Sequence, residues 1–536
     1  MRTEAREGNG GFEAGGSGPG HRHTCLDESD SRLRRRALIL SVIVLVLFVL
    51  GIRIFYYIPD DTYITLRYAR NVIDGKGFVF NEGERLEGYT NYLWLIILIL
   101  IGKLGGSLPT AARTLSLIAS CATLILAGYI AWVHRPPRAS GWSAALAVIT
   151  APLLLAASPP FLTWSLSGTE IPLFTFLLLL GVAFITTGRN TASVLVVFGL
   201  LGLVRPEGIL FYILAGAILL DTKHRKGDVI VQGAWIFALM YAPYLIWKWR
   251  YFGGLLPNTF YAKTGPIRIM TRNGMSYLLG FLARYGYFLV IGILMLHKHL
   301  RDQRRVTVPV FFILIHWAEV LILGGDWMPH YRLLLPTLPL IALVVSYGLM
   351  KVGARSGDIG DGTKWRNPVP VVVTILVVLA MIPGGIGYDE FIYERIVVGA
   401  YVRLGQVLGE ILPPTTSIAL GSTGAIGFYS GLEIIDILGL TERHIAHEGR
   451  IVATQPGHMK ADGRYVLKQK PDLLLLGNVQ IHLGRRSEDE MPIKIQEREI
   501  TKQPEFAKRY EFINIPIGRN FYLSCYKHRD LILSPE

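Results

Sequence analysis

Long apolar runs recur along this chain and constrain its fold more than any other feature. They have roughly 17–25 residues, the length that an α-helix needs to cross the hydrocarbon core of a bilayer. Of the 536 residues, 51% are hydrophobic and only 18% are charged, which is too apolar for one soluble domain. We therefore predict a polytopic membrane protein, all-α within the bilayer. About eleven spans are expected near residues 37–57, 109–133, 141–157, 170–187, 191–204, 208–220, 229–249, 276–297, 307–325, 331–350 and 368–387.

The basic residues between these runs predict the orientation of the chain. Arginines precede the first run, and later basic segments lie at 134–138, 221–228, 297–305 and 351–366. Lys and Arg are enriched in cytoplasmic loops, so the net charge of +14 indicates topology before it indicates nucleic acid. We place the N-terminus and these segments in the cytoplasm. The apolar segment 92–105 is short for a span, and we interpret it as re-entrant or surface-lying.

This orientation divides the chain into three parts. Residues 1–36 contain many Gly and polar residues and are predicted to be a disordered cytoplasmic tail. Residues 37–387 form the transmembrane domain, and its first outer loop covers 58–108. Residues 388–536 are expected to form an extracytoplasmic domain.

The C-terminal domain is predicted to be α/β. The stretch 416–441 alternates strand, Gly-rich turn and strand patterns, and 471–477 is a candidate buried strand. The three cysteines, Cys25, Cys121 and Cys525, are far apart and predict no disulfide framework or metal cluster.

Two neighbouring carboxylates, Asp60 and Asp61, follow the first apolar run directly and open a helical pattern over 62–74. Arg67 and Arg70 fall on the polar face of that pattern, which we expect to face anionic groups at the membrane surface. One aspartate could be the N-cap of this helix, but a cap accounts for only one of the two. A carboxylate pair at an outer surface can also act in acid–base chemistry.

Further motifs on the predicted outer side combine acids, cations, amides and aromatic rings. Their candidate side chains are Glu87, Tyr89, Glu170, Arg205, Glu207, Asn258, Tyr261, Lys263, Asp326, Trp327, His330 and Arg332. The stretch "SGTE" (167–170) has the spacing of a capping box. The stretch "RPEG" (205–208) places charges between two apolar half-runs, where ionised groups face a polar cavity or each other. Tryptophans at helix ends are commonly interfacial anchors, and no metal-ligand spacing is present.

In chain order, these motifs resemble those of the AftB-type family of C-type glycosyltransferases, whose members include terminal arabinofuranosyltransferases. The matching stretches, between about residues 55 and 480, are "DDTYITLRYARNVIDGKGFVFNEGERLEGYTNYLW", "SGTE", "RPEG", "LLPNTFYAK", "GGDWMPHYRLLLPTLPL" and "GFYSGLEIIDILGLTERHIAH". The resemblance implies a C-type glycosyltransferase helical bundle, a catalytic aspartate in the first outer loop, and a donor sugar carried on polyprenyl phosphate.

The resemblance also implies roles for individual residues. One of Asp60 and Asp61 would be the general base on the acceptor hydroxyl, and the other would orient the acceptor or hold a divalent metal ion, the one cofactor considered. The cations expected at the departing phosphate are Arg67, Arg70, Arg205, Lys263 and Arg332. The residues expected to contact substrate are Glu87, Tyr89, Glu170, Glu207, Asn258, Tyr261, Asp326, Trp327 and His330.

We therefore predict a multi-pass glycosyltransferase of the inner (plasma) membrane. It would move an arabinofuranosyl or related sugar from a polyprenyl-phosphate donor to a cell-envelope glycan acceptor on the outer face. Inversion by a single displacement is expected, because no separate nucleophile is evident. The predicted partners are this donor, this acceptor and membrane lipids, with no nucleic acid. The alternatives are a transporter or flippase of lipid-linked sugar, although paired broken helices are not evident, and a glycan-binding scaffold protein.

Overall fold

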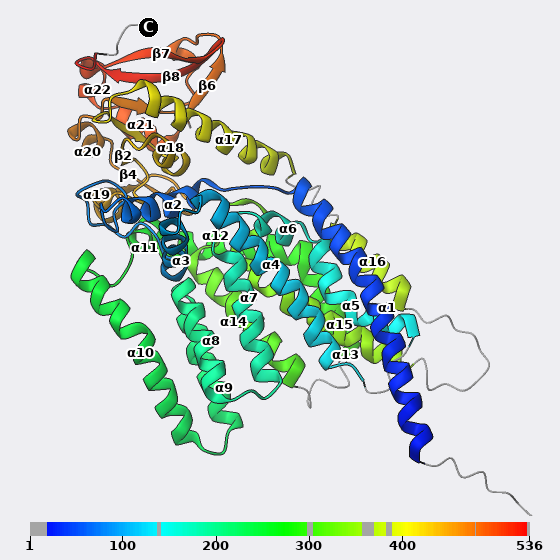
Figure 1. Ribbon diagram of the computed structural model, residues 1–536. Helices are drawn as coiled ribbons and strands as arrows, with labels where there is room; N and C mark the ends of the chain where they lie inside the picture. Colours follow the sequence, from blue (N-terminus) through cyan, green and yellow to red (C-terminus); the bar gives the residue numbers. More distant parts are fainter. Residues whose placement is uncertain are drawn as a thin grey trace, which may run out of the picture.

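The protein consists of a helical bundle and a C-terminal domain that contains a β-sheet, joined by the long helix α17 (Tyr388–Ile411) (Figure 1). The computed structural model describes residues 19–136, 141–296, 304–355, 369–381, 388–477 and 479–532.

Each predicted membrane span contains a helix of the bundle, and the short helix α6 lies between two of these spans. These helices are α1 (Pro19–Ile54), α4 (Leu108–Val133), α5 (Gly141–Ala157), α6 (Pro159–Ser165), α7 (Ile171–Thr186), α8 (Thr191–Val204), α9 (Gly208–Thr222), α10 (Lys226–Phe252), α12 (Ile267–Phe281) continued through the π-turn η1 (Leu282–Gly286) into α13 (Tyr287–Leu296), α14 (Arg304–Leu323), η3 (Pro329–Thr337) with α15 (Leu338–Arg355), and α16 (Val369–Met381). The protein is a multi-pass membrane protein.

Length and apolar composition alone identify fewer spans than the sequence pattern predicts. Six described helices are long and apolar enough to cross a membrane, and α5 with α6, bent by 65°, makes a seventh if the pair is one span. Adding the shorter apolar helices α7, α8, α9 and α16 would reach the eleven spans expected from the sequence. That total stays a prediction.

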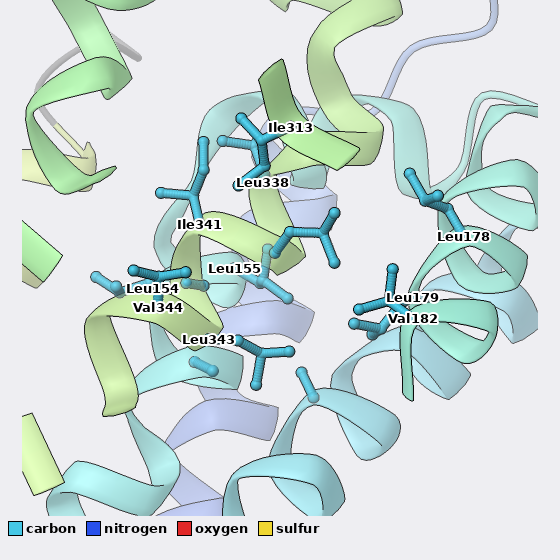
Figure 2. Close-up of a cluster of buried hydrophobic side chains, with 14 of the residues drawn as sticks. Leu154, Leu155, Leu178, Leu179, Val182, Ile313, Leu338, Ile341, Leu343 and Val344 are labelled. Atoms are coloured by element: carbon cyan, nitrogen blue, oxygen red, sulfur yellow. The ribbon is translucent and has the colours of Figure 1, made fainter. Parts of the chain in front are cut away.

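The helix α15 lies at the centre of the bundle. In the most apolar stretch of the span Pro329–Val352, 94% of the residues are buried. Its Leu343 and Val344 lie in one buried cluster with Leu154 and Leu155 of α5 and with Leu178 and Leu179 of α7 (Figure 2). Lipid tails are as apolar as these side chains, so close van der Waals packing holds the helices together. This packing fixes the positions of the helix ends that carry the polar site.

The helices α8 and α9 form a tight hairpin whose turn is the "RPEG" segment. A Cβ on Gly208 would lie 2.4 Å from the backbone nitrogen of Gly202, so only glycine permits this close approach. Pro206 lies in the turn, after α8 has ended at Val204. The hairpin therefore carries Arg205 and Glu207 at its tip.

Two helices belong to the loop 58–108: α2 (Asp60–Ile73) and α3 (Tyr92–Lys103). Both ends of α3 meet α2. Asn91, which precedes α3, bonds Thr65, and a side chain on Gly102 would meet Ile73. The segment 92–105 therefore lies alongside α2, and its depth in the membrane stays a prediction.

The C-terminal domain contains a mixed six-stranded sheet. Its strands β1 (Ser417–Leu420), β2 (Glu433–Asp436) and β5 (Leu473–Leu475) run parallel, in the order β2-β1-β5. The strand β8 (Phe521–His528) pairs antiparallel with β5, β6 (Gln480–Leu483) and β7 (Tyr510–Gly518). The remaining elements are α19 (Arg443–Glu448), β3 (Arg450–Ile451), β4 (Lys460–Ala461), α20 (Gly463–Lys468), η5 (Glu488–Glu490), α21 (Ile495–Thr501) and α22 (Pro504–Arg509).

Two local predictions were wrong. The Gly-rich segment between β1 and β2 is the helix α18 (Thr423–Ser430) rather than a turn, because a crossover between parallel strands needs a covering element. The helix α1 begins at Pro19, so residues 19–36 are helical and do not belong to a disordered tail. Residues 1–18 lie outside the described part of the chain.

The helix α2 binds the C-terminal domain through the start of α18. The carboxylate of Asp60 accepts hydrogen bonds from the backbone N–H groups of Gly424, at 2.8 Å, and Ala425, at 2.7 Å. The N-terminus of a helix carries unpaired N–H groups and a partial positive charge, which favour an anion. Burial raises the pKa of Asp60 to about 6, although these two N–H groups act to lower it.

We predict that Gly424→Ala loosens the C-terminal domain from the bundle. A Cβ at this position would lie 2.0 Å from the backbone oxygen of Asp60, so the substitution should lower the free energy of unfolding by about 2 kcal/mol. Thermal unfolding of the purified protein measures this change. The control is Gly399→Ala in α17, where a Cβ meets nothing within 4 Å. Equal unfolding temperatures for the two variants would contradict the prediction.

Candidate active site

A cavity of about 470 Å³ lies where the loop 58–108, the ends of several bundle helices and the segment 256–264 meet. Its charged lining residues are Asp61, Glu170, Arg205, Glu207, Lys263, Glu319, Asp326 and Arg332. Tyr89, Trp327 and Phe260 add aromatic rings. The cavity combines acids and cations at the edge of an apolar bundle, where each ionised group needs a partner.

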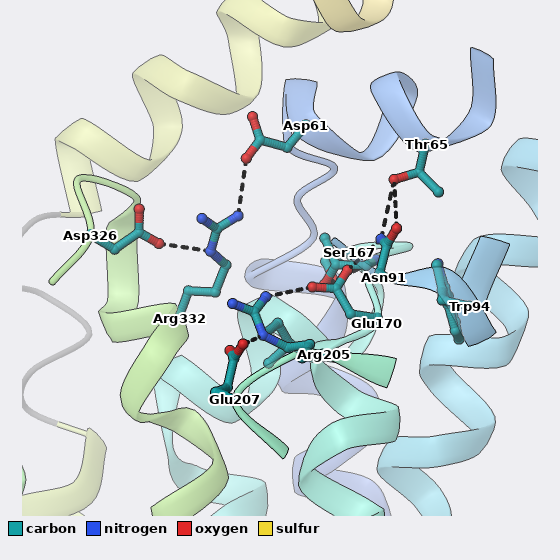
Figure 3. Close-up of polar contacts among 12 residues, drawn as sticks. Asp61, Thr65, Asn91, Trp94, Ser167, Glu170, Arg205, Glu207, Asp326 and Arg332 are labelled. Carbon is teal, nitrogen blue, oxygen red and sulfur yellow. Dashed lines mark hydrogen bonds and ion pairs between the residues drawn. The ribbon is translucent and has the colours of Figure 1, made fainter. Parts of the chain in front are cut away.

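Arg332 holds two carboxylates at one side of the cavity (Figure 3). Its Nε donates to Asp326 Oδ2 at 2.7 Å, and its Nη1 donates to Asp61 Oδ2 at 3.2 Å. The side chains of Arg332 and Asp326 are 9% and 7% exposed, whereas that of Asp61 is 30% exposed. Asp326 is therefore buried and held by Arg332, whereas the carboxylate of Asp61 stays accessible from the cavity.

The backbone before Arg332 turns sharply to make this contact. Gly324 and Gly325 have φ of 87° and 69°, and His330 and Tyr331 also take left-handed values, 55° and 50°. Non-glycine residues rarely adopt this conformation, so surrounding contacts must hold it in place. Burial acts to raise the pKa of Asp326, but the nearby charges of Arg332 and Lys263 hold it below its usual value.

Arg205 binds two further carboxylates, at the tip of the α8–α9 hairpin (Figure 3). It donates to Glu170 Oε1 at 2.6 Å and also pairs with Glu207. Glu170 in turn accepts from Asn91 at 2.9 Å. The predicted capping box of "SGTE" is wrong, because Ser167 bonds Trp164 and Thr169 instead and Glu170 turns to Arg205.

The structure adds two residues that sequence reasoning missed. Glu319, on α14, lines the cavity, and its Oε2 lies 2.9 Å from His316 Nδ1. The other ring nitrogen, Nε2, contacts the carbonyl oxygen of Leu333 at 2.7 Å. A carbonyl only accepts, so Nε2 donates, and the His316–Glu319 contact holds one more proton on either partner. Ionisable residues inside an apolar run, here 307–325, are the signal that could have identified them.

Nine predicted site residues line the cavity together. They are Asp61, Tyr89, Glu170, Arg205, Glu207, Lys263, Asp326, Trp327 and Arg332. Three others, Glu87, Asn258 and Tyr261, line a second, neighbouring cavity. Glu87, in the loop 58–108, forms a buried ion pair with Lys248 of α10, at 2.7 Å.

Asp60, Arg67 and Arg70 lie elsewhere. They face the C-terminal domain: Arg67 donates to the carbonyls of Gly427 and Leu432, each at 2.7 Å, and Arg70 donates to that of Phe428 at 2.5 Å. The expectation that these arginines face a membrane surface is wrong, because the polar face of α2 covers α18. Asp60 is not an N-cap of α2 either, since that position is Pro59.

His330 does not line the cavity. Its ring lies 5.7 Å from that of Phe55 and 5.4 Å from that of Phe391. Its Nδ1 contacts the Thr163 hydroxyl at 2.7 Å. The structure gives His330 a packing position in place of the predicted contact with substrate.

The aspartate pair does not fit a shared metal ion. Both oxygens of Asp60 accept backbone N–H groups, and one oxygen of Asp61 is bound by Arg332. Across the described ranges, no group of three or more His, Cys, Asp or Glu side chains is arranged to hold a metal ion. The lining cations, by contrast, are suited to a phosphate.

Comparisons with known proteins agree with the resemblance seen in the motifs. The chain is 28% identical over 341 residues to a terminal beta-(1->2)-arabinofuranosyltransferase of Corynebacterium glutamicum, covering 55% of this chain and 48% of the relative. A protein of the same name from Mycobacterium tuberculosis is 28% identical over 342 residues, covering 55% and 53%. The chain thus spans about half the length of the curated relatives it matches. The predicted resemblance to arabinofuranosyltransferases is confirmed.

The fold as a whole is similar to that of ArnT from Cupriavidus metallidurans. The apo structure superposes with a TM-score of 0.57 at 12% identity, covering 91% of this chain and 97% of ArnT. The structure bound to undecaprenyl phosphate gives 0.53 at 11% identity, covering 93% and 99%. Residues 390–529 match a family described as "Domain of unknown function (DUF8728)". The protein therefore has the C-type glycosyltransferase fold that the motifs predicted.

We predict that Arg205→Gln destabilises the protein strongly. The substitution leaves Glu170 and Glu207 without their shared cation, and breaking such a buried pair costs about 3 kcal/mol. Thermal unfolding should show a clear decrease. The matched control is Lys76→Gln, which breaks an ion pair to Glu82 whose side chains are 41% and 72% exposed and should change little. A native unfolding temperature for Arg205→Gln would contradict the prediction.

Proposed function

We propose that this protein is an integral-membrane glycosyltransferase. It moves an arabinofuranosyl or related sugar from a polyprenyl-phosphate donor to a cell-envelope glycan acceptor, by an inverting single displacement on the outer face of the membrane. The observation that carries the proposal is an accessible carboxylate, Asp61, held beside three cations in one cavity. The arabinofuranosyltransferase relatives and the ArnT-like fold support it.

Asp61 is the general base of the proposed reaction. One of its oxygens is bound by Arg332, which orients the carboxylate and leaves the second oxygen for the acceptor hydroxyl. The base takes the hydroxyl proton as the acceptor oxygen attacks the anomeric carbon. Asp60, whose two oxygens are both occupied by backbone N–H groups, has the separate task of holding the C-terminal domain. This division supports Asp61, rather than Asp60, as the base.

The departing phosphate is stabilised by cations that remain available at the cavity. Lys263 and Arg332 come from different segments and both line it. Their positive charge meets the negative charge that develops on the phosphate oxygen as the bond to the sugar breaks. Arg67 and Arg70 are excluded from this task by their bonds to α18 carbonyls.

The proposed orientation places this cavity and the C-terminal domain outside the cytoplasm. The cavity lies at the end of the bundle that contacts the C-terminal domain, since Asp61 follows Asp60 on α2. Basic side chains gather at a separate end, where Arg135, Arg304, Arg305 and Lys351 line another cavity. Enrichment of Lys and Arg on the cytoplasmic side supports this orientation.

We predict that Asp61→Asn abolishes sugar transfer while the protein still folds and binds donor. Loss of a general base lowers kcat by about 10²–10⁴-fold. The assay uses purified protein in lipid, a polyprenyl-phosphate arabinofuranose donor and an arabinan acceptor. Asp60→Asn is the matched comparison: it should lower the unfolding temperature but keep kcat per folded molecule within about threefold of native. Full transfer by Asp61→Asn, or movement of lipid-linked sugar across the bilayer without transfer, would refute the proposal.

We predict that Arg332→Lys lowers kcat/KM for the donor by about 100-fold. Lysine cannot bond Asp326, Asp61 and a phosphate together, because it lacks the planar fork of the guanidinium. Steady-state kinetics with varied donor measures the change. Arg70→Lys serves as the control, since Arg70 faces the Phe428 carbonyl. The same loss in both variants would show that Arg332 acts only through the stability of the fold.

A further inference from the structure

A second cavity, of about 550 Å³, lies between the bundle and the C-terminal domain. Its lining comes from the loop 58–108 (Leu86 and Glu87), from the segment 252–261, and from α19 and α20 with the residues just before α19. This size is within the range of about 300–1,000 Å³ that is usual for ligand cavities. The proposed chemistry at Asp61 does not use it.

Flat rings and hydrogen-bonding groups share the wall of this cavity. Tyr261 stacks on His447 with ring centroids 4.0 Å apart, and His444 stacks on Tyr465 with the same separation. Glu442, which accepts a hydrogen bond from the Tyr465 hydroxyl, adds a carboxylate to the lining. Rings present flat apolar faces, and carboxylates accept hydrogen bonds from hydroxyls. A saccharide offers both a C–H face and hydroxyl donors.

The wall is held in place before any ligand arrives. Glu442 accepts from the Tyr465 hydroxyl at 2.8 Å and from the backbone N–H of Ile445 at 2.7 Å. His444 Nε2 lies 2.9 Å from Asp462. Lys460 donates to the Tyr261 carbonyl at 2.9 Å. Groups fixed in this way lose little conformational entropy when they bind a ligand.

Asn258 connects the three walls and keeps one unused acceptor. Its backbone N–H donates to the carbonyl of Glu87 at 2.8 Å. Its amide nitrogen donates to the carbonyls of Gly439, Leu440 and Glu442 at 2.8–3.1 Å. Carbonyls only accept, so these contacts fix the orientation of the amide. Its Oδ1 is buried and has no hydrogen-bond partner. A hydroxyl donor at the cavity would satisfy an acceptor that is costly to leave unpaired.

The two cavities are separated by a single thickness of chain. Leu256 lines both of them. Asn258 lines the second cavity, while Pro257 and Thr259 on either side of it line the Asp61 cavity. A chain-like ligand with one end beside Asp61 would need to cross only this segment, at Leu256, which is 50% exposed, to reach the second cavity.

We infer that the second cavity binds the inner sugar units of a saccharide acceptor whose terminal hydroxyl is placed at Asp61. This inference rests on the proposed function. It names the substrate class that the C-terminal domain recognises: a neutral oligosaccharide, held by the Tyr261–His447 and His444–Tyr465 ring pairs and by Glu442. The C-terminal domain thereby selects acceptors long enough to reach both cavities.

The test measures oligosaccharide binding and transfer separately, with the full-length protein in lipid nanodiscs. The probe is a soluble arabinofuranosyl oligosaccharide long enough to reach both cavities, and the monosaccharide is the short comparison. The double variant His444→Ala with His447→Ala removes one ring from each stacked pair. It should weaken oligosaccharide binding about tenfold. It should raise the acceptor KM similarly and leave kcat and donor KM unchanged. His447→Phe, which keeps a flat ring, should restore most of the loss caused by His447→Ala.

The control is His482→Ala, on β6 of the same domain, which lies outside the cavity lining and should change neither binding nor KM. Oligosaccharide binding that is sensitive to the ring variants, without any transfer by the native protein, would support the saccharide site and count against the glycosyltransferase. Transfer with the same acceptor KM in the native protein and the double variant would overturn the site and leave the glycosyltransferase standing. Equal binding of the monosaccharide and the oligosaccharide would also overturn it.

Discussion

Ionised groups at the end of an apolar bundle must find partners, and this requirement organises the polar half of the protein. Arg205 binds Glu170 and Glu207, and Arg332 binds Asp326 and Asp61. Burying a charge without a partner is expensive, so Arg205 joins α7 to the α8–α9 hairpin, and Arg332 joins η3 to α2. Asn91 links the two groups, because it bonds both Glu170 and Thr65 of α2. The candidate active site is the place where this network leaves one carboxylate accessible.

The C-terminal domain is part of that unit rather than an appendage. Asp60 holds the start of α18, Arg67 bonds two carbonyls after it, and Asn258 bonds three carbonyls ahead of α19. Asn258 also belongs to the segment that separates the two cavities, since its neighbours Pro257 and Thr259 line the Asp61 cavity. Catalysis at Asp61 and recognition of an acceptor by the domain would thus depend on one set of contacts.

The neighbouring aspartates show how position along a helix separates two roles. Asp60 and Asp61 differ by one residue, and successive residues on a helix point about 100° apart. One carboxylate therefore turns to the N-terminus of α18, and the other turns to Arg332. Arg67 and Arg70 are three residues apart and therefore share one face of α2. The C-terminal domain covers this face.

The sequence by itself determined the membrane class, a helix at each predicted span, the α/β character of the last domain and nine of the residues that line the cavity. Run length, strand patterns and charges within apolar segments are local properties, so one sequence suffices to predict them. Only the tertiary structure decided that Asp61 and not Asp60 faces the cavity, that Arg67 and Arg70 bind carbonyls, and that Glu319 joins the site. These outcomes depend on contacts between residues hundreds of positions apart, such as Asp60 with Gly424 and Arg332 with Asp61, and local sequence patterns carry no information about such pairs.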